Sequence, residues 1–409
     1  MNVFSKMFQT KCMNIFFERN GKKERSGPMR PLIFSASIGH GHEQAAKALK
    51  NELEIREYQP EIIDTFQSLS PMLHKIMLQS YLRLLKKNPT LWRKIYFHAQ
   101  EVPHYLWLDK FALLFTDKLN KLLDGEEIPF LISTHPFVTA FLTTLKRKKQ
   151  LDIPLYTVIT DYVLHPAYYR EEIDGYFTAD TNMQQFSERY NIPSEKFTVS
   201  GIPVPPCDSV NQSKWKIRYD LQLPHDSKIV LVAGGGIGLT NYEEVIQSLE
   251  KCQRPFLVLC MTGYNLKAYE KVSALKSKHE IKVIKYTDKF LDYLKASDVV
   301  ISKAGGLTMT EALLCETPIL VYQPVPGHEE ENAAYLVGQG AALKADTDEQ
   351  ISILTKRILY NEKIKKSMKQ AAKKLKTPDA AQVIVEQIVR KHDDIRDYPL
   401  SRRKLSVYR

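Results

Sequence analysis

The feature that most constrains the fold is an alternation of short apolar runs with longer amphipathic stretches, which occurs twice along the chain. Strand–helix–strand alternation is typical of parallel sheets covered by helices on both faces. The expected strands of the first series are residues 31–36, 61–65, 129–133, 154–160 and 175–178, and those of the second are 228–233, 255–261, 281–286, 298–302 and 318–322. The stretches 43–57, 241–251 and 269–278 are among the expected helices.

A proline-rich segment, GIPVPP at residues 201–206, separates the two series. Proline restricts and extends the backbone, as expected of a linker between domains. The sequence therefore predicts an α/β protein with two Rossmann-like, doubly wound domains, residues 31–206 and 207–390, between a basic extension 1–30 and a basic tail 391–409. Because such sheets bind ligands at the carboxyl ends of their strands, the chemistry is expected in the cleft between the domains.

The composition narrows the class of partner. A formal net charge of +11 favours an acidic membrane surface, a phosphorylated substrate or nucleic acid. Nucleic acid is disfavoured, because the basic residues are interleaved with the glycine motifs described below and no RNA-binding signature is present. The five cysteines form no CxxC pair, which favours a reducing, cytoplasmic setting. No run of about 18 apolar residues is present, so contact with a membrane is expected to be peripheral.

Residues 72–115 combine aromatic with basic side chains. Between Met72 and Phe97 there are six Lys or Arg and no acid, together with Trp92 and Tyr96. Amphipathic helices of this composition suit a lipid interface. The alternative is an ordinary helical insertion whose aromatic side chains belong to the core, and the sequence leaves both interpretations open.

Two glycine-rich turns each follow an expected strand and open an expected helix. They are SASIGHGHE at residues 35–43 and AGGGIGLT at residues 233–240. Glycine lets backbone N–H groups approach an anion at a helix N-terminus, so Gly41, Gly235 and Gly236 are candidates for contact with a phosphorylated donor. A dinucleotide-binding turn, or a tight turn without a ligand, has the same local pattern. No P-loop lysine follows either turn, which disfavours an NTPase.

A third turn, SKAGGLTMTEAL at residues 302–313, predicts a more specific site. The helix start at Gly306, Leu307 and Thr308 can hold a diphosphate on its N–H groups, and Glu311, one turn later, can accept hydrogen bonds from ribose hydroxyls. The alternative for Glu311 is a helix acid stabilised by the dipole. The segment PGHEEEN at residues 326–332 then supplies His328, Glu329 and Asn332 for the donor sugar or phosphates.

A possible metal motif occurs at Asp346-Thr347-Asp348, which has the DxD form found in metal-dependent transferases. Residues 347–350, TDEQ, also precede an apolar-periodic helix as a capping box does. The capping box is the preferred interpretation, and neither a metal nor a cofactor is expected.

Several motifs together resemble one glycosyltransferase family. They are SASIGHGHEQAAKAL, TDYVLHP, VSGIPV, GGGIG, SDVVISKAGGLTMTEAL and PVPGHEEENAAYL, in this order between about residues 31 and 387. The chain is similar to monogalactosyldiacylglycerol synthases and bacterial processive diacylglycerol glucosyltransferases, and more distantly to MurG. The resemblance implies a GT-B fold, a UDP-sugar held mainly by the C-terminal domain, inversion at the anomeric carbon and no obligatory metal. The chain has His328 where the family commonly has Gln, and His40 where it often has Asn.

The same resemblance places the candidate general base, and the strand ends supply further candidates on the acceptor side. His42, at the end of GHGH, is the candidate general base, kept neutral by the helix dipole; the alternative is a histidine that caps the turn. Asp161 ends an expected strand and is assigned to orienting His42 or contacting the acceptor, or else to capping the following loop. His135, with the same ambiguity, and His165 are placed on the acceptor side.

The resemblance also places uracil near Tyr286 and Thr287, through main-chain contacts. The expected activity is transfer of a hexosyl group from UDP-glucose or UDP-galactose to a lipid hydroxyl, on diacylglycerol or a glycosyldiacylglycerol, by an enzyme at the inner face of the cell membrane. Transfer to another lipid-linked or small acceptor is one alternative. A UDP-sugar-binding sensor without catalysis is the other.

Overall fold

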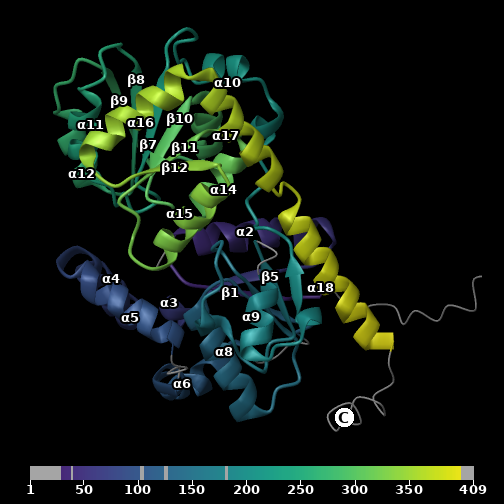
Figure 1. Ribbon diagram of the computed structural model, residues 1–409. Helices are drawn as coiled ribbons and strands as arrows, with labels where there is room; N and C mark the ends of the chain where they lie inside the picture. The colour runs from purple at the N-terminus through teal and green to yellow at the C-terminus, as the bar shows by residue number, and fades with distance from the viewer. Residues whose placement is uncertain (1–28, 38–39, 102–105, 124–127, 180–182, 398–409) are drawn as a thin grey trace, which may run out of the picture.

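The computed structural model describes residues 29–37, 40–101, 106–123, 128–179 and 183–397 (Figure 1). The molecule has two lobes, each built on a six-stranded parallel sheet. The strand order is β2–β1–β3–β4–β5–β6 in the first sheet and β12–β11–β10–β7–β8–β9 in the second. The predicted α/β architecture with two doubly wound domains is therefore confirmed.

The strands of the first sheet are β1 (Leu32–Ser35), β2 (Glu61–Asp64), β3 (Leu131–Ser133), β4 (Leu155–Val158), β5 (Gly175–Thr178) and β6 (Phe197–Val199). Those of the second are β7 (Ile229–Ala233), β8 (Leu257–Gly263), β9 (Glu280–Lys285), β10 (Val299–Ser302), β11 (Ile319–Tyr322) and β12 (Ala342–Ala345). Strands β6 and β12 were not expected from the sequence. Both are edge strands with partly exposed side chains, so neither carries the continuous apolar run of a central strand.

The helices of the first half are α2 (His40–Ile55), α3 (Thr65–Leu69), α4 (Pro71–Lys87), α5 (Pro89–Glu101), α6 (Leu106–Leu113), α7 (Thr116–Leu122), α8 (Pro136–Lys149) and α9 (Met183–Tyr190). Those of the second half are α10 (Lys214–Asp220), α11 (Tyr242–Leu249), α12 (Leu266–Ser273), α13 (Phe290–Ala296), α14 (Gly306–Leu314), α15 (His328–Gly338), α16 (Asp348–Tyr360), α17 (Glu362–Leu375) and α18 (Ala380–Asp397). None of the helices in these ranges combines the length and apolar character needed to cross a bilayer.

The strand order of each sheet reverses at one place. In the first sheet the chain runs outward from β1 to β2 and in the other direction from β3 to β6; in the second sheet the reversal lies between β7 and β10. Loops on either side of such a reversal diverge and leave a crevice at the carboxyl ends of the strands. His42 lies in the first turn of α2, after β1, and His135 lies between β3 and α8; Gly236 lies in the turn after β7, and Gly306 begins α14 after β10.

The last helix, α18, returns to the first lobe (Figure 1). Its buried side chains Ile384, Val385 and Ile388 join a cluster with Ile33, Leu49 and other residues of the first domain. The expected boundary at residue 390 assigned most of this helix to the second domain. The chain therefore crosses between the lobes twice, and the crossings meet where Gly201, at φ +84°, leaves no room for a Cβ beside Thr377.

The start of α16 does not form the predicted capping box. Thr347 is the N-cap residue, but its side chain accepts no hydrogen bond from the helix. Gln350 does turn back, and its Oε1 accepts from the Asp346 N–H at 2.8 Å. Asp348 instead accepts a hydrogen bond from the Tyr322 hydroxyl. Neither bond of the box is formed, because Gln350 reaches the residue before the N-cap, and the half-buried Asp348 carboxylate is held by a tyrosine.

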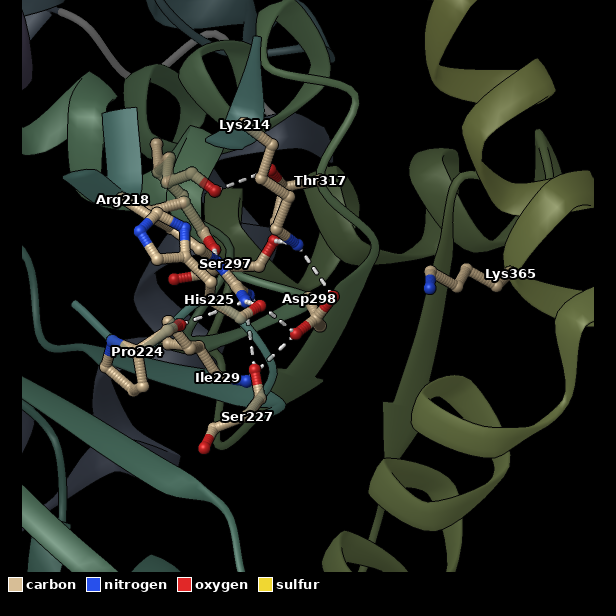
Figure 2. A network of polar contacts seen from close by, with 12 residues as sticks. Lys214, Arg218, Pro224, His225, Ser227, Ile229, Ser297, Asp298, Thr317 and Lys365 are labelled. Atoms are coloured by element: carbon tan, nitrogen blue, oxygen red, sulfur yellow. Dashed lines mark hydrogen bonds and ion pairs between the residues drawn. The ribbon is translucent and has the colours of Figure 1, made fainter. Parts of the chain in front are cut away.

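A network of charged side chains connects α10 with Asp298, the residue directly before β10 of the second sheet (Figure 2). Arg218 donates to Asp298 Oδ2 at 3.0 Å and to four backbone carbonyls, those of Pro224, His225, Ser227 and Ala296. Lys214 donates to Asp298 Oδ1 at 2.6 Å. Burial opposes ionisation of Asp298, but the two cations outweigh it and lower the pKa of that carboxyl, while burial lowers the pKa of Lys214 to about 8.

Candidate active site

The two crevices face each other and form one cleft of about 1310 Å³. The first domain lines it with the start of α2, the loops after β3 and β4, and the α4–α5 hairpin. The second domain lines it with the turns after β7 and β10, the segment before α13 and the start of α15. All candidate residues but one, Asn332, lie on its lining.

His42 lies at the crevice of the first sheet. Its Nδ1 is 2.6 Å from the Thr134 carbonyl oxygen and 3.0 Å from Thr160 Oγ1. Because a carbonyl can only accept, Nδ1 carries the hydrogen and Nε2 keeps its lone pair. Burial lowers the pKa of His42, and the Asp161 charge only partly offsets this effect. The ring is therefore neutral and can accept a proton.

His135 packs against His42, with ring centroids 4.5 Å apart. Its Nδ1 accepts from the Phe137 N–H, which caps helix α8. His165 makes the same kind of cap: its Nδ1 accepts from the Ala167 N–H. Burial lowers the pKa of both histidines, that of His165 to about 4. Both are neutral helix-capping residues at the wall of the cleft.

Asp161 and Asn332 meet across the cleft. Asn332 Nδ2 donates to Asp161 Oδ1 at 2.8 Å and to the Ala304 carbonyl at 3.2 Å, and its Oδ1 accepts from the Tyr162 N–H at 2.8 Å. The Asn332 side chain is fully buried and uses its polar atoms in these contacts. It joins the two domains, and its place is beside the cleft rather than on its surface.

The glycine turns bring the domains into direct contact. A Cβ at Gly306 would collide with the Thr160 carbonyl oxygen, and a Cβ at Gly41 would lie 3.4 Å from the Leu307 side chain. A Cβ at Gly236 would lie 2.7 Å from His40, whose Nε2 is 3.3 Å from the Tyr286 hydroxyl. The turn that carries His42 therefore lies against both glycine turns of the second domain.

Glu311 lies on α14, one turn past Gly306, with little exposed surface on the lining of the cleft. Burial raises the pKa of Glu311 to about 8. A carboxyl group that is costly to ionise in the free protein is suited to receive hydroxyl donors from a ligand. Beyond it, Tyr286 stacks on Tyr264 with ring centroids 4.3 Å apart, and Thr287 Oγ1 accepts from the Lys289 N–H at 3.1 Å.

Lys303 was not among the residues singled out from the sequence. It directly follows β10, and its Nζ donates to Glu329 Oε1 at 2.6 Å. The other oxygen of Glu329 accepts from the Val325 N–H at 2.7 Å, so Glu329 holds both the Lys303 ammonium and the loop before α15 in place. Lys303 also lies beside Gly235, where a Cβ would be 3.9 Å from its Cε. The sequence did hold a signal for Lys303, because this lysine comes at the end of an expected strand and shortly before two consecutive glycines.

The aromatic residues of α5 correct the membrane interpretation in part. Trp92 Nε1 donates to the Pro326 carbonyl at 3.0 Å, and the Tyr96 hydroxyl donates to Glu331 Oε2 at 2.7 Å. Trp92 and Tyr96 therefore face the second domain, and only other side chains of this hairpin are available to a lipid. Among the side chains of the hairpin that the structure describes, Met72, Ile76, Leu91 and Ile95 are apolar and exposed.

Within the described residues, no group of three or more His, Cys, Asp or Glu is placed to hold a metal ion. The cleft instead holds positive groups: the Lys303 ammonium and the N-terminus of α14 lie beside the second-domain glycine turns, and Lys47, Lys50 and Lys285 also line it.

Comparisons with known proteins agree with this geometry. Residues 42–204 match the family model of monogalactosyldiacylglycerol synthase, and residues 229–386 match that of the glycosyltransferase family 28 C-terminal domain. A processive diacylglycerol beta-glucosyltransferase of Bacillus cereus is 28% identical over 90% of this chain and 96% of its own, and one of Bacillus pumilus is 27% identical over 92% and 98%. Acinetobacter baumannii MurG superposes with a TM-score of 0.58 at 17% identity, over 89% of this chain and all of that one. The predicted resemblance and GT-B fold are confirmed.

Proposed function

We propose that this hexosyltransferase, in which a monogalactosyldiacylglycerol synthase domain precedes a family 28 C-terminal domain, transfers a hexosyl group from UDP-glucose or UDP-galactose to a lipid hydroxyl with inversion. The acceptor is diacylglycerol or a glycosyldiacylglycerol. The observation that carries the proposal is the contact of the start of α14 with the first domain: Leu307 lies against Gly41, next to His42, and Gly306 lies against Thr160. This contact brings a neutral base and an anion-binding helix start to the same part of the cleft.

The proposed reaction is a single displacement. His42 Nε2 accepts the proton of the acceptor hydroxyl as that oxygen bonds to the anomeric carbon. The bond from the anomeric carbon to the diphosphate oxygen breaks on the opposite face, and UDP leaves with that electron pair. Asp161, through its charge, favours the imidazolium that forms, because an opposite charge nearby raises the pKa of His42.

The donor is proposed to lie along the second domain. Gly235, Gly236 and the N–H groups of Gly306, Leu307 and Thr308 hold the diphosphate, and Glu311 accepts from the ribose hydroxyls. Tyr286 and Thr287 flank the uracil, and His328 faces the sugar. Lys303, which Glu329 holds at 2.6 Å, supplies the positive charge that a leaving diphosphate requires.

Because these groups can neutralise the leaving diphosphate, we propose that the transfer reaction needs no metal ion. Turnover is expected to continue at its full rate in excess EDTA. Loss of turnover in the chelator, with recovery on addition of magnesium or manganese, would contradict it.

The acceptor side is proposed to open toward the α4–α5 hairpin. Met77, Leu84, Leu85 and Ile95 line this end of the cleft, and apolar walls suit acyl chains. The hairpin is proposed to rest on an anionic membrane at the inner face of the cell membrane through Met72, Ile76 and Leu91 and through its exposed lysines. Each basic residue near such a surface contributes about 1 kcal/mol.

Flotation with liposomes tests the membrane contact. The variant Lys75→Glu/Lys87→Glu/Lys94→Glu is expected to lose flotation with anionic vesicles while UDP binding survives. The matched control, Lys363→Glu/Lys366→Glu/Lys373→Glu, changes the same charge on exposed positions of α17 and should float as wild type does. Equal loss in both variants would place the contact elsewhere.

The activity is tested with liposomes that contain diacylglycerol and with labelled UDP-glucose or UDP-galactose. A labelled glycosyldiacylglycerol, formed by wild type and not by His42→Ala, is the expected product. Chromatography of the lipids identifies the sugar and the number of residues added. Tight binding of UDP-sugar with no labelled lipid in any arm would indicate a sensor instead of a transferase.

A further inference from the structure

We infer that Tyr96, on α5 of the first domain, is a positioning residue for the turn at residues 326–328 in the second domain. The inference rests on the proposed function, because it takes this turn and His328 to face the sugar of the donor. Its new content is that a residue of the acceptor-side hairpin holds a donor-side turn in place.

The first observation is the packing of Tyr96 on Gly327. Gly327 has φ +91°, a conformation that side chains other than hydrogen rarely adopt. A Cβ there would lie 2.6 Å from Cγ of the Tyr96 ring. The turn and the ring therefore approach as closely as a glycine allows, and the turn cannot relax toward α5.

The second observation is a set of polar contacts around the ring. The Tyr96 hydroxyl donates to Glu331 Oε2 at 2.7 Å, Trp92 Nε1 donates to the Pro326 carbonyl at 3.0 Å, and Arg93 Nε lies 3.2 Å from Glu330 Oε2. Trp92 and Tyr96 are four residues apart and so share one face of α5. This face holds residues 326, 327, 330 and 331, on both sides of His328.

The third observation is the position of His328 itself. It is the first residue of α15, it lines the cleft, and its ring centroid is 6.2 Å from that of Tyr96. On the side of the first domain the Tyr96 ring contacts His165, at 4.5 Å between centroids, and Phe97, at 5.4 Å, so the ring is held between the two domains. A displacement of about 1 Å in a group that orients a substrate can cost on the order of a hundredfold in rate. Loosening the turn at Gly327 is thus expected to affect the sugar end of the donor and to spare the nucleotide end.

The test uses Tyr96→Phe in the full-length protein, which keeps the ring on Gly327 and removes the hydroxyl. Hydrogen exchange of the amides at residues 324–331 is expected to accelerate, with unchanged exchange in β7. UDP is expected to bind as to wild type, whereas the dissociation constant of UDP-glucose or UDP-galactose, whichever wild type uses, rises about tenfold, as loss of a hydrogen bond to a charged group predicts.

Three further variants separate positioning from general loss of structure. Glu331→Gln keeps an acceptor oxygen for the hydroxyl and should stay near wild type. Tyr96→Phe/Glu331→Gln should be no worse than Tyr96→Phe alone. Tyr360→Phe, far from the cleft, is the matched control and should change neither exchange at 324–331 nor binding.

The outcomes distinguish this inference from the proposed function. Unchanged exchange at 324–331 in Tyr96→Phe overturns the inference, whatever the activity of the protein. Faster exchange with unchanged UDP-sugar binding also overturns the inference, because the turn would then not contribute to binding of the sugar. Failure of wild type to bind UDP-sugar or to form a glycolipid rejects the proposed function itself, and with it the role of Tyr96 toward a sugar.

Discussion

Asn332 of α15 donates its side-chain amide to the carboxylate of Asp161, 2.8 Å away in the other domain. Sequence reasoning assigned the first residue to the donor and the second to catalysis, and in the structure they bind each other. Asp161 also acts on the candidate base, since its charge raises the pKa of His42 against the effect of burial. This hydrogen bond therefore links the contact between the two domains to the charge that acts on His42.

This relationship predicts coupled variants. Asn332→Ala and Asp161→Ala are each expected to lower turnover, and the double variant to lose less than the sum. The expected coupling energy is about 0.5–3 kcal/mol, as for residues in direct contact. Steady-state rates of the four proteins give this energy, and strict additivity would show that the two residues act separately.

His42→Ala is expected to lower turnover by about 10²–10⁴, as loss of a general base does, with UDP affinity close to wild type. Because the pKa of His42 is lowered, the base is neutral above that depressed value, so wild-type activity should persist down to the ordinary histidine value of 6.5 and fall only at lower pH. The pH dependence of kcat/KM measures this. A decline that begins above pH 6.5 would contradict the assignment.

Glu311→Gln is expected to change both binding and stability. The pKa of Glu311 is raised to about 8 from an ordinary value near 4.5, so the folded state holds its proton more tightly than the unfolded state. The folded protein therefore loses stability as pH rises from about 4.5 to 8, by about 1.4 kcal/mol per pKa unit. The variant should lack this decline in denaturant titrations, and calorimetry should show weaker UDP binding. Parallel stability profiles of the two proteins would argue against a buried, unpaired carboxyl.

Lys303→Met keeps much of the side-chain volume and removes the charge. If Lys303 neutralises the diphosphate, UDP affinity is expected to fall by about 1.5–3 kcal/mol, and uridine affinity to stay unchanged. Calorimetry with both ligands measures the difference. An equal loss of uridine affinity would mean that Lys303→Met disturbs the fold by leaving Glu329 unpaired, and that Lys303 does not act on the diphosphate.

Asp298→Asn is a test of stability remote from the cleft. It leaves Arg218 buried without its carboxylate partner, and breaking such a buried pair costs about 3–5 kcal/mol. The free energy of unfolding from urea titration should fall by this amount, with an unchanged dissociation constant for UDP at temperatures where the variant is folded. A loss below about 1 kcal/mol would mean that the backbone carbonyls around Arg218 suffice.

The strand ends and glycine turns were predictable because they depend on local patterns. Buried central strands such as β7 and β10 are nearly continuous apolar runs, Gly234 directly follows the first, and Gly305 and Gly306 come shortly after the second. The contacts of α5 were not predictable in this way. Trp92 and Pro326 are 234 residues apart, and an aromatic residue on an amphipathic helix gives the same signal whether it faces lipid, its own core or another domain. The pairing of Asn332 with Asp161 could not be predicted either, because these two residues are also far apart in the sequence.

The return of α18 also has a consequence for dissecting the protein. Residues 202–376 form one uninterrupted insertion, which carries all six strands of its own sheet. The first domain, in contrast, is discontinuous, since Ile384, Val385 and Ile388 complete its core from the far end of the chain. A fragment cut at residue 206 would expose the apolar groove that this helix fills. The second domain can therefore be excised with two cuts, whereas the first is whole only if its two pieces are rejoined by a short artificial bridge from Gly201 to Thr377.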